Sequence, residues 1–454
     1  MANSLQEVFH NVHQALVRGE KETLIRQSGS TAAGHHEKIR SGQSYLYKKY
    51  GMESEVIEIR FRQKVSGSFL NQALSQAICR YPYFNTRLIE KDGDFYIVQN
   101  PNAPVARRTQ KLARLGHISC GYHLVDITYY DFSVYVAFHH ALCDGRGIKP
   151  FVETLLYYYC QLRYKTAERP EGVRLAGEPL LEGETLDPFL RKYDFDASKD
   201  FISLSRDAYV LPESAAKAEK TNYRYEIMLP HDRFMAVCRE NNATPVILLS
   251  LLMSRGIAAL YPNYDKPINA NIATDMRAAL DAPNTFKNCV RSMILPYDHE
   301  FAARTLKDQA TQYRELLARQ RDRDFCRREA NNMMGLFDRL DALDSYGEKQ
   351  KIMAFFEDMA LPTYVVSYLG QFILGENAAH INSIHLYNSG TAGLGINMIA
   401  CGDRFVLDFK QSFPSDKYAK AFVREAEALG IDCEISEAVA FETPGDFIVR
   451  HPEE

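Results

Sequence analysis

The segment from Ser133 to Lys149, SVYVAFHHALCDGRGIK, predicts an apolar strand that ends in two adjacent histidines, followed by an aspartate and a glycine. Side chains along a strand alternate between its two faces. His140 therefore continues the apolar face of the strand, whereas His139 points to the opposite face. Two side chains that diverge in this way do not easily chelate one metal ion.

A metal site built from His140 and Asp144 is also disfavoured. These residues would need helical spacing to meet at one ion, and Gly145 and Gly147 predict a turn instead. We therefore expect no metal. The other alternative to a catalytic role is a pair of buried, hydrogen-bonded histidines, which is the usual interpretation of an arbitrary histidine pair.

A second histidine pair in the chain provides an internal comparison. His35 and His36, in AGHHEKIRSG, follow no apolar strand, and Arg40 stands where Asp144 stands after the first pair. We assign this second pair no role. The first pair differs because a strand, an aspartate, a glycine turn and an amphipathic helix agree around it.

The helix that follows the histidines is the clearest in the sequence. Apolar residues recur at helical spacing from Ile148 to Leu162, and Pro150 falls in the expected first turn, where its missing N–H costs little. Upstream, residues 54–62 alternate like a strand. Residues 66–82 predict a helix that begins at a serine cap and ends at a proline.

Both halves of the chain mix strands with helices, and a segment without sustained periodicity separates them. Residues 86–99 predict a hairpin with Asp-Gly at its turn. Residues 174–222 are rich in Pro, Ser, Asp and Lys and predict the connection between the halves. In the second half we expect strands at 223–230, 267–277, 363–372, 381–390, 393–402 and 404–413, and helices at 231–241, 244–260, 301–328 and 415–431.

Length and composition limit the class of protein. A chain of 454 residues is too long for one ordinary core, so we expect two domains. A net charge of −4 argues against a nucleic-acid binder, which needs a strongly basic face. The nine cysteines are dispersed without a CxxC pair, which is typical of reduced cytoplasmic thiols. The longest apolar run, PVILLSLLM from Pro245, is too short for a membrane span, and we expect a cytoplasmic protein without a membrane partner.

Around the histidines the chain resembles a known family. HHALCDG, from His139 to Gly145, fits the HHxxxDG signature of the CoA-dependent acyltransferase superfamily, which includes chloramphenicol acetyltransferase, peptide-synthetase condensation domains, alcohol acyltransferases and plant HxxxD acyltransferases. Three further segments resemble family elements in the family's order, and the set covers most of residues 45–415. They are LNQALSQAICRYPYFNTRLIEKDGDFYIV, NNATPVILLSLLMSRGIAAL and NIATDMRAAL, which carries a (D/N)xR element.

The resemblance implies an α/β fold made of two chloramphenicol-acetyltransferase-like sandwich domains, arranged as a pseudo-dimer with an active-site tunnel between them. We accordingly expect an N-terminal half at residues 1–178, a connecting segment at 179–220 and a C-terminal half at 221–454. In such a fold the acyl donor enters from one face and the acceptor from the other, and they meet at the histidine.

The resemblance also assigns roles to residues near the signature. His140 is expected to be the general base that takes the acceptor's proton during attack on the thioester carbonyl. Asp144 is expected to pair with an arginine and hold the turn that orients the histidine. Arg277 of TDMR is the best match for that arginine, and Arg291 is the alternative.

Four further residues complete the expected site, and a nearby thiol is left out of it. Gly145 is expected to allow the sharp turn, and His139 to support the site by packing and hydrogen bonding. The family forms no covalent enzyme intermediate, so Cys143 is not expected to act as a nucleophile. Ser389 and Thr391 are tentative donors to the oxyanion or the substrate, with an ordinary polar loop as the alternative.

The activity implied by the resemblance is transfer of an acyl group from acyl-CoA to a hydroxyl or amine of a small acceptor, with no permanently bound cofactor. Two alternatives stay open. One is a stand-alone condensation enzyme that takes its thioester from a carrier protein, and the other is a non-catalytic binding relative of the same fold. A single unit of the size of an acyltransferase accounts for the whole chain, which favours acyl-CoA over a carrier protein as the donor. The intact signature favours an enzyme over a non-catalytic relative.

Overall fold

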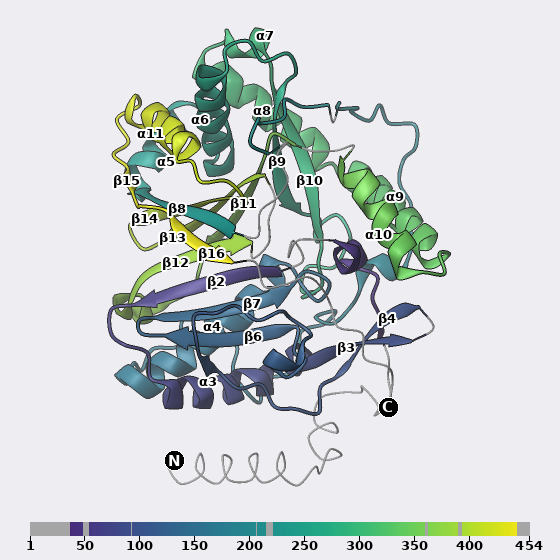
Figure 1. The fold of residues 1–454 in the computed structure, drawn as a ribbon, viewed down its shortest axis with the longest axis vertical. Coiled ribbons are helices and arrows are strands. Elements are labelled where there is room, and N and C mark those ends of the chain that lie inside the picture. Colours follow the sequence, from purple (N-terminus) through teal and green to yellow (C-terminus); the bar gives the residue numbers. More distant parts are fainter. Residues whose placement is uncertain are drawn as a thin grey trace.

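Two large β-sheets organise the chain, one in each half of the molecule (Figure 1). The computed structural model describes residues 37–48, 54–91, 93–205, 207–214, 221–358, 362–388 and 393–442. The first sheet contains, in spatial order, β12 (Ile381–Asn388), β2 (Ser54–Phe61), β7 (Ser133–His139), β6 (Val125–Tyr130) and β5 (Arg107–Arg108). A small sheet beside it contains β1 (Glu37–Lys38), β4 (Asp94–Gln99) and β3 (Thr86–Lys91).

The alternating apolar residues of β2 and β7 explain the first sheet. They form one buried face that packs against α3 (Gly67–Arg80) and α4 (Gly145–Tyr164), the two helices drawn in blue in Figure 1. Ile57, Ile59 and Phe138 from the strands are fully buried in this core. The sheet therefore holds the end of β7, and with it the histidine pair, in a rigid layer.

A strand from late in the chain completes this first sheet. β12 pairs antiparallel with β2, and Leu386 lies opposite Ile57 while Asn388 lies opposite Glu55. β12 also packs against β13 and β14 of the second sheet. The strand that follows β11 thus crosses from one half to the other, and it brings residues 381–388 to the junction between them.

The second sheet is larger and mostly antiparallel. Its strands, in spatial order, are β10 (Val290–Tyr297), β9 (Ile268–Asp275), β11 (Tyr364–Gln371), β13 (Leu394–Cys401), β14 (Arg404–Gln411), β8 (Thr221–Pro230) and β15 (Glu434–Ile435), and β16 (Val439–Glu442) also pairs with β8. The helices that follow β8 in the chain are α5 (His231–Glu240), α6 (Pro245–Leu260), α7 (His299–Ala302), α8 (Leu306–Gln320), α9 (Arg323–Asp341), α10 (Tyr346–Asp358) and α11 (Lys417–Glu427).

The most apolar helix, α6, belongs to the core of the second half. Its residues from Ile247 to Met253 are buried, because α6 packs between the sheet and helices α8 and α11. Among the described residues no single helix is long and apolar enough to cross a membrane. Helices α5 and α6 reach that length and composition only together, and they are bent by 85° at the break between them.

Two helices differ from the sequence prediction. The helix after the histidines begins at Gly145 rather than Ile148, because the Asp144 side chain accepts the Gly147 amide and caps it three residues earlier. Pro150 consequently lies in the second turn, not the first. The charged helix expected at 301–328 is divided between α8 and α9, since the carboxylate of Asp322 caps the start of a new helix.

The connecting segment packs across both halves as a chain with few regular elements. Glu184 receives two hydrogen bonds from the buried guanidinium of Arg80 on α3, at 2.8 and 2.9 Å. The carbonyl of Glu184 also accepts the amide of Phe286 from the second half. The structure has five short 3₁₀ helices in its described parts: η1 (Gln43–Tyr47), η2 (Pro82–Phe84), η3 (Ile118–Cys120), η4 (Pro188–Leu190) and η5 (Gly375–His380).

Candidate active site

His140 is the first residue beyond β7, where the chain turns at residues 140–142. The amides of Leu142 and Cys143 donate to the carbonyl of His139 and close this turn. The His140 ring lies 4.5 Å from the ring of Tyr45, which η1 supplies. Its side chain keeps 13% of its surface exposed, so the imidazole is packed on one side and reachable on another.

The hydrogen bonds of His140 decide which of its nitrogens is basic. Nδ1 lies 3.3 Å from the carbonyl oxygen of Cys143, which can only accept, and 3.5 Å from the side-chain nitrogen of Asn288. The shorter contact, to the carbonyl oxygen, assigns the proton to Nδ1. The Asn288 side chain donates to the main-chain carbonyl of His140 at 2.9 Å and fixes the turn from the second half. Nε2 is therefore the nitrogen with a free lone pair, as a general base requires.

Asp144 and Arg277 form a buried, bidentate ion pair between the two halves. The two terminal nitrogens of Arg277 donate to Oδ1 and Oδ2 of Asp144 at 2.8 and 2.9 Å, and both side chains are at most 1% exposed. The alternative partner, Arg291, pairs with Glu329 instead. Of the two arginines that the sequence offered, the fold brings Arg277 to the aspartate.

Every donor of the Arg277 guanidinium is satisfied. Besides the aspartate it reaches the carbonyls of Thr285 and Lys287 and the carboxylate of Asp275. Asp144 in turn accepts the amide of Cys289 at 2.8 Å as well as the helix-capping amide of α4. Burial opposes the charge on Arg277, but the carboxylate of Asp144 outweighs it and raises the pKa of the arginine. The pair therefore locks the histidine turn to the second half.

Gly145 and Gly147 do not form the turn that the sequence predicted. Gly145 is the first residue of α4, and its backbone does not adopt the left-handed conformation. A methyl group at Gly145 would meet Leu369 at 3.0 Å, a flexible side-chain end. A methyl group at Gly147 would clash with the main-chain carbonyl oxygen of Phe286. The tighter constraint thus lies at Gly147, where the two halves touch.

We expect Gly147→Ala to lower the free energy of unfolding by about 2 kcal/mol, because neither backbone can move aside without strain. Gly145→Ala is the matched control and should cost clearly less, since the Leu369 side chain can rotate. Urea unfolding of both variants measures the difference. Equal costs would show that the contact with Phe286 is not what requires glycine.

His139 is fully buried and lies apart from the reactive nitrogen. Its Nδ1 accepts the amide of Ala141 at 3.0 Å, and its Nε2 has no partner among the described residues. Burial, assisted by the neighbouring His140, lowers the pKa of His139 to about 3. The neutral ring thus accepts a hydrogen bond from an amide of the turn and supports the backbone of that turn.

Cys143 is also buried, and burial raises the pKa of its thiol well above the ordinary value. A thiol in this state is a poor nucleophile. Ser389 and Thr391, the tentative oxyanion donors, lie outside the described residues. They stay predictions.

Glu55 and Asn288 are site residues that the sequence interpretation missed. Glu55, the second residue of β2, places Oε1 3.5 Å from Nε2 of His140. Glu55 shares the face of Ile57 and Ile59 in SEVIEIRF, and a carboxylate on that apolar face was the signal that could have drawn attention to it. Asn288 follows no recognisable pattern, because its role comes from the meeting of two distant segments.

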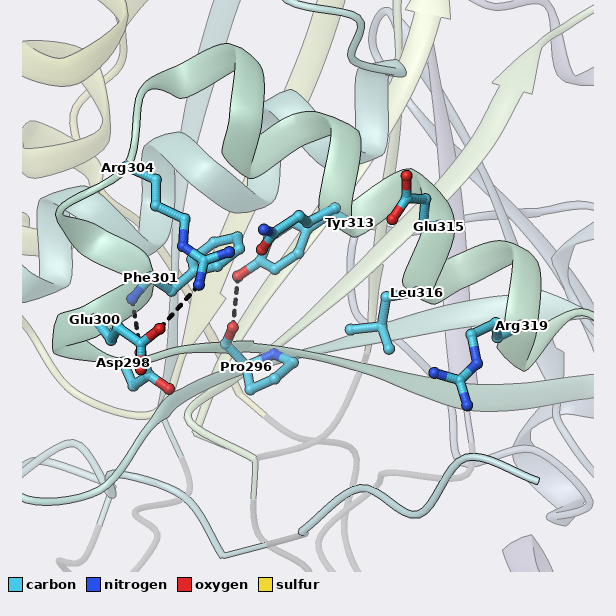
Figure 2. Close-up of a pocket in the computed structure, with 10 residues that line it drawn as sticks. Pro296, Asp298, Glu300, Phe301, Arg304, Tyr313, Glu315, Leu316 and Arg319 are labelled. Carbon is cyan, nitrogen blue, oxygen red and sulfur yellow. Dashed lines mark hydrogen bonds and ion pairs between the residues drawn. The ribbon is translucent and has the colours of Figure 1, made fainter. Parts of the chain in front are cut away.

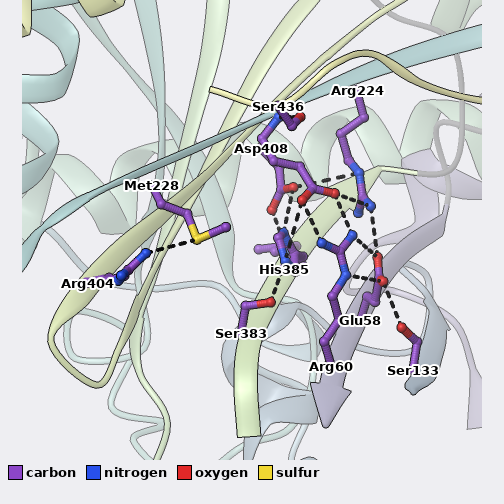
Figure 3. A network of polar contacts seen from close by, with 12 residues as sticks. Glu58, Arg60, Ser133, Arg224, Met228, Ser383, His385, Arg404, Asp408 and Ser436 are labelled. Carbon is purple, nitrogen blue, oxygen red and sulfur yellow. Dashed lines mark hydrogen bonds and ion pairs between the residues drawn. The ribbon is translucent and has the colours of Figure 1, made fainter. Parts of the chain in front are cut away.

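A buried polar network joins the sheets elsewhere along the same junction, and Figure 3 shows it. The guanidinium of Arg60 on β2 binds Glu58 and also Glu226 of β8. Arg224 of β8 donates to Glu58 at 2.9 Å and to Glu226 at 2.8 Å. These contacts connect β2 of the first sheet with β8 of the second.

Ser383, His385 and Asp408 extend this network in an order that serine hydrolases also use. The Ser383 hydroxyl lies 2.9 Å from Nε2 of His385, whose Nδ1 donates to Asp408 at 3.0 Å. All three side chains are at most 1% exposed, and their polar atoms are already paired with one another. Ligand atoms of Glu226, His385 and Asp408 lie within 4.8 Å of one another, but arginines and a main-chain amide already bind the carboxylates. The group is therefore an ion-pair network.

The network should make the protein sensitive to acid. Burial opposes the charge of Glu58, but Arg224 and Arg60 outweigh it and lower its pKa from 4.5 to about 2. The stabilisation is therefore complete above pH 4.5 and is lost as the pH falls through about 2. It is worth about 3 kcal/mol. Urea unfolding at a series of pH values should show a steeper loss below pH 4.5 for the native protein than for Glu58→Gln, and parallel curves would contradict this assignment.

The hollows described on the surface lie away from His140. Figure 2 shows one of about 310 Å³ beside α7 and α8, lined by residues that include Phe301, Tyr313 and Arg319. Figure 1 places these helices at the end of the second half that is far from the first sheet. We assign this hollow no role.

Solved structures with the same fold exist, although no protein-family model and no curated protein matches the sequence. Polyketide synthase associated protein 5 from Mycobacterium tuberculosis is 13% identical, covers 87% of this chain and 97% of its own, and has a TM-score of 0.56. TRI101 from F. sporotrichioides, complexed with coenzyme A and T-2, is 12% identical over 88% of this chain and 99% of its own, with a TM-score of 0.58. The first condensation domain of the CDA synthetase is 13% identical over 87% of this chain and 95% of its own, with a TM-score of 0.55. The expected two-half α/β fold is thereby confirmed, and at these identities the likeness concerns the fold alone.

Proposed function

We propose that the protein is an acyltransferase, which moves an acyl group from a thioester to a hydroxyl or amine with His140 as general base. The observation that carries the proposal is the His140 ring itself. Its Nδ1 faces the carbonyl of Cys143 at 3.3 Å, and its Nε2 is directed away from that bond on a side chain that is still partly exposed. The fold shared with condensation domains and with a coenzyme A complex supports the thioester as donor.

The reaction follows from that geometry. Nε2 of His140 takes the proton of the acceptor while the acceptor attacks the thioester carbonyl, and the resulting imidazolium returns the proton to the departing thiolate. No covalent bond to the protein is needed, in agreement with the buried and protonated thiol of Cys143. Ser389 and Thr391 remain the proposed donors to the oxyanion.

The other signature residues support the base. Asp144 and Arg277 hold the turn and the start of α4, so they act on catalysis through the position of His140. His139 stabilises the same turn from its buried side, and Gly145 leaves room for Leu369 at the helix start.

The halves proposed for this chain are residues 1–178 and 221–454, joined by 179–220, with the substrate tunnel between them. The proposal has the donor enter from one face and the acceptor from the other. Acyl-CoA is the donor that we favour, and a carrier-protein thioester is the alternative. All nine cysteines are free thiols, which agrees with the proposed cytoplasmic location.

The test is release of free thiol from acetyl-CoA in the presence of a panel of alcohols and amines. Thiol release that depends on an acceptor supports the proposal. If coenzyme A thioesters are inert, the same panel with an acyl carrier protein separates the two donors. Absence of release with both donors would favour the non-catalytic relative of the fold.

A further inference from the structure

Oε2 of Glu55 and Nζ of Lys410 are buried and have no partner in the described part of the chain. Nε2 of His139 also has no partner, but its ring is neutral, whereas Glu55 and Lys410 are groups that can carry a charge. Buried polar atoms are almost always hydrogen-bonded, and exceptions at a functional site are usually completed by a ligand or by water. The pair therefore indicates a place that a bound molecule fills.

Glu55 lies at the edge of the proposed reaction centre. It stands opposite Phe138 of β7 and Asn388 of β12, at the end of the first sheet where His140 follows. Oε1 accepts a hydrogen bond from the Asn388 side chain at 3.3 Å and lies 3.5 Å from Nε2 of His140. One carboxylate oxygen is thus held beside the base, and the other is left free.

Lys410 approaches the same junction from the second sheet. It lies two residues beyond Asp408 on β14 and so shares its face, and Asp408 binds the Leu386 amide and the His385 ring of β12. Lys410 therefore points toward the end of β12, where Asn388 holds Glu55. Its side chain is 2% exposed and has no ion-pair partner among the described residues.

The charges of these two residues define what would satisfy them. Burial lowers the pKa of Lys410 to about 7, although the charge of Glu55 opposes this effect, so an anion beside it would be strongly stabilising. Glu55 and Lys410 do not form an ion pair with each other. A molecule that carries a cation for the carboxylate and an anion for the ammonium would complete both groups.

We propose that the acceptor is an amino acid, whose ammonium group binds Glu55 beside His140 and whose carboxylate binds Lys410. This inference rests on the proposed function, because it names the acceptor of that reaction. A simple alcohol would use neither charge.

The reaction then balances as follows. The ammonium gives up one proton to solvent and a second to Nε2 of His140, and the amine nitrogen forms a bond to the thioester carbonyl carbon. The carbon–sulfur bond breaks, and the thiolate takes the proton from the imidazolium. The products are an N-acyl amino acid, a free thiol and one proton in solution.

The experiment compares each proteinogenic L-amino acid with its amide, which lacks the carboxylate, and with the corresponding simple amine. Binding is measured by calorimetry without a donor, and acyl transfer by mass spectrometry with acetyl-CoA. At least one amino acid should bind and be acylated, and its amide should be roughly 100-fold weaker. Lys410→Met and Glu55→Gln should each weaken binding of the amino acid to the same degree.

Two controls separate binding from folding. Lys410→Met should melt at or above the temperature of the native protein, since it removes an unpaired buried charge. Lys420→Met, on an exposed part of α11, should leave binding unchanged.

Each remaining outcome decides the inference. If no amino acid binds, or if amide and amino acid are equivalent, or if Lys410→Met binds normally, the inference is overturned. Acylation of alcohols or amines without a carboxylate overturns it and leaves the proposed acyltransfer intact. Amino acid binding that depends on Lys410 but gives no thiol release with any donor supports the binding site and overturns the proposed acyltransfer.

Discussion

His140→Ala should reduce kcat/KM for thiol release by roughly 1000-fold, which is the usual contribution of a well-placed general base. The loss should appear in kcat more than in KM, because the proton is transferred in the transition state. The melting temperature should hardly change, since the ring's hydrogen-bond contacts are the two long ones at Nδ1, to the Cys143 carbonyl and the Asn288 side chain, and part of its surface is exposed. The measurement is thiol release with the acceptor that the panel identifies, together with a thermal melt.

His139→Ala is the matched control for this variant. It removes the ring that accepts the amide of Ala141 inside the core, so its main effect should be on the free energy of unfolding. The two variants should thus differ in their effects, with His140→Ala lowering turnover and His139→Ala lowering stability. If His140→Ala retained native turnover, the base would have to be another group and the proposed function of His140 would be wrong.

Asp144→Ala should be the most destabilising single change in the site, with a loss of about 4 kcal/mol in the free energy of unfolding. The variant leaves the buried guanidinium of Arg277 with only Asp275 as a charged partner and removes acceptors for the amides of Gly147 and Cys289. Most domains have only about 5–15 kcal/mol of stability, so we expect the yield of folded protein to fall as well. Urea unfolding measures the loss.

A double-mutant cycle tests the pairing. Asp144→Ala combined with Arg277→Met should cost clearly less than the sum of the two single variants, because neither charge is left alone in the interior. Arg291→Met serves as the comparison, since Arg291 pairs with Glu329 rather than with Asp144. Additive losses for Asp144 and Arg277 would contradict a direct contribution of their ion pair.

Much of the site could be predicted because its signals are local. The end of β7, the histidine turn and α4 form one continuous stretch, in which strand and helix periodicities and the aspartate cap act within a few residues. The start of α4 was placed three residues late because apolar periodicity begins after the cap. The partner of Asp144 needed a resemblance, since Arg277 lies 133 residues away and no local pattern connects them.

Neither the network around Glu58 nor the residues proposed to bind the acceptor, Glu55 and Lys410, could be predicted in the same way. Glu55, Lys410 and Asn288 come from three separate segments, and each has an ordinary sequence context. The junction that holds Glu55 and Lys410 depends on β12, which follows β11 in the chain but pairs with β2 in the first sheet. Periodicity shows that a strand exists and which face is apolar, but it does not say which strand becomes its neighbour.

The sequence by itself therefore determined the strand that ends at the histidine pair, the opposite faces of His139 and His140, the helix behind them and the two-half α/β class. These features depend on backbone geometry and on apolar spacing within short stretches. Only the tertiary structure decided that Arg277 meets Asp144, that Glu55 faces His140 and that Lys410 is buried without a partner. The reason is physical, because charged groups this far apart in the chain interact only after two sheets have closed over them and excluded the water that would otherwise screen them.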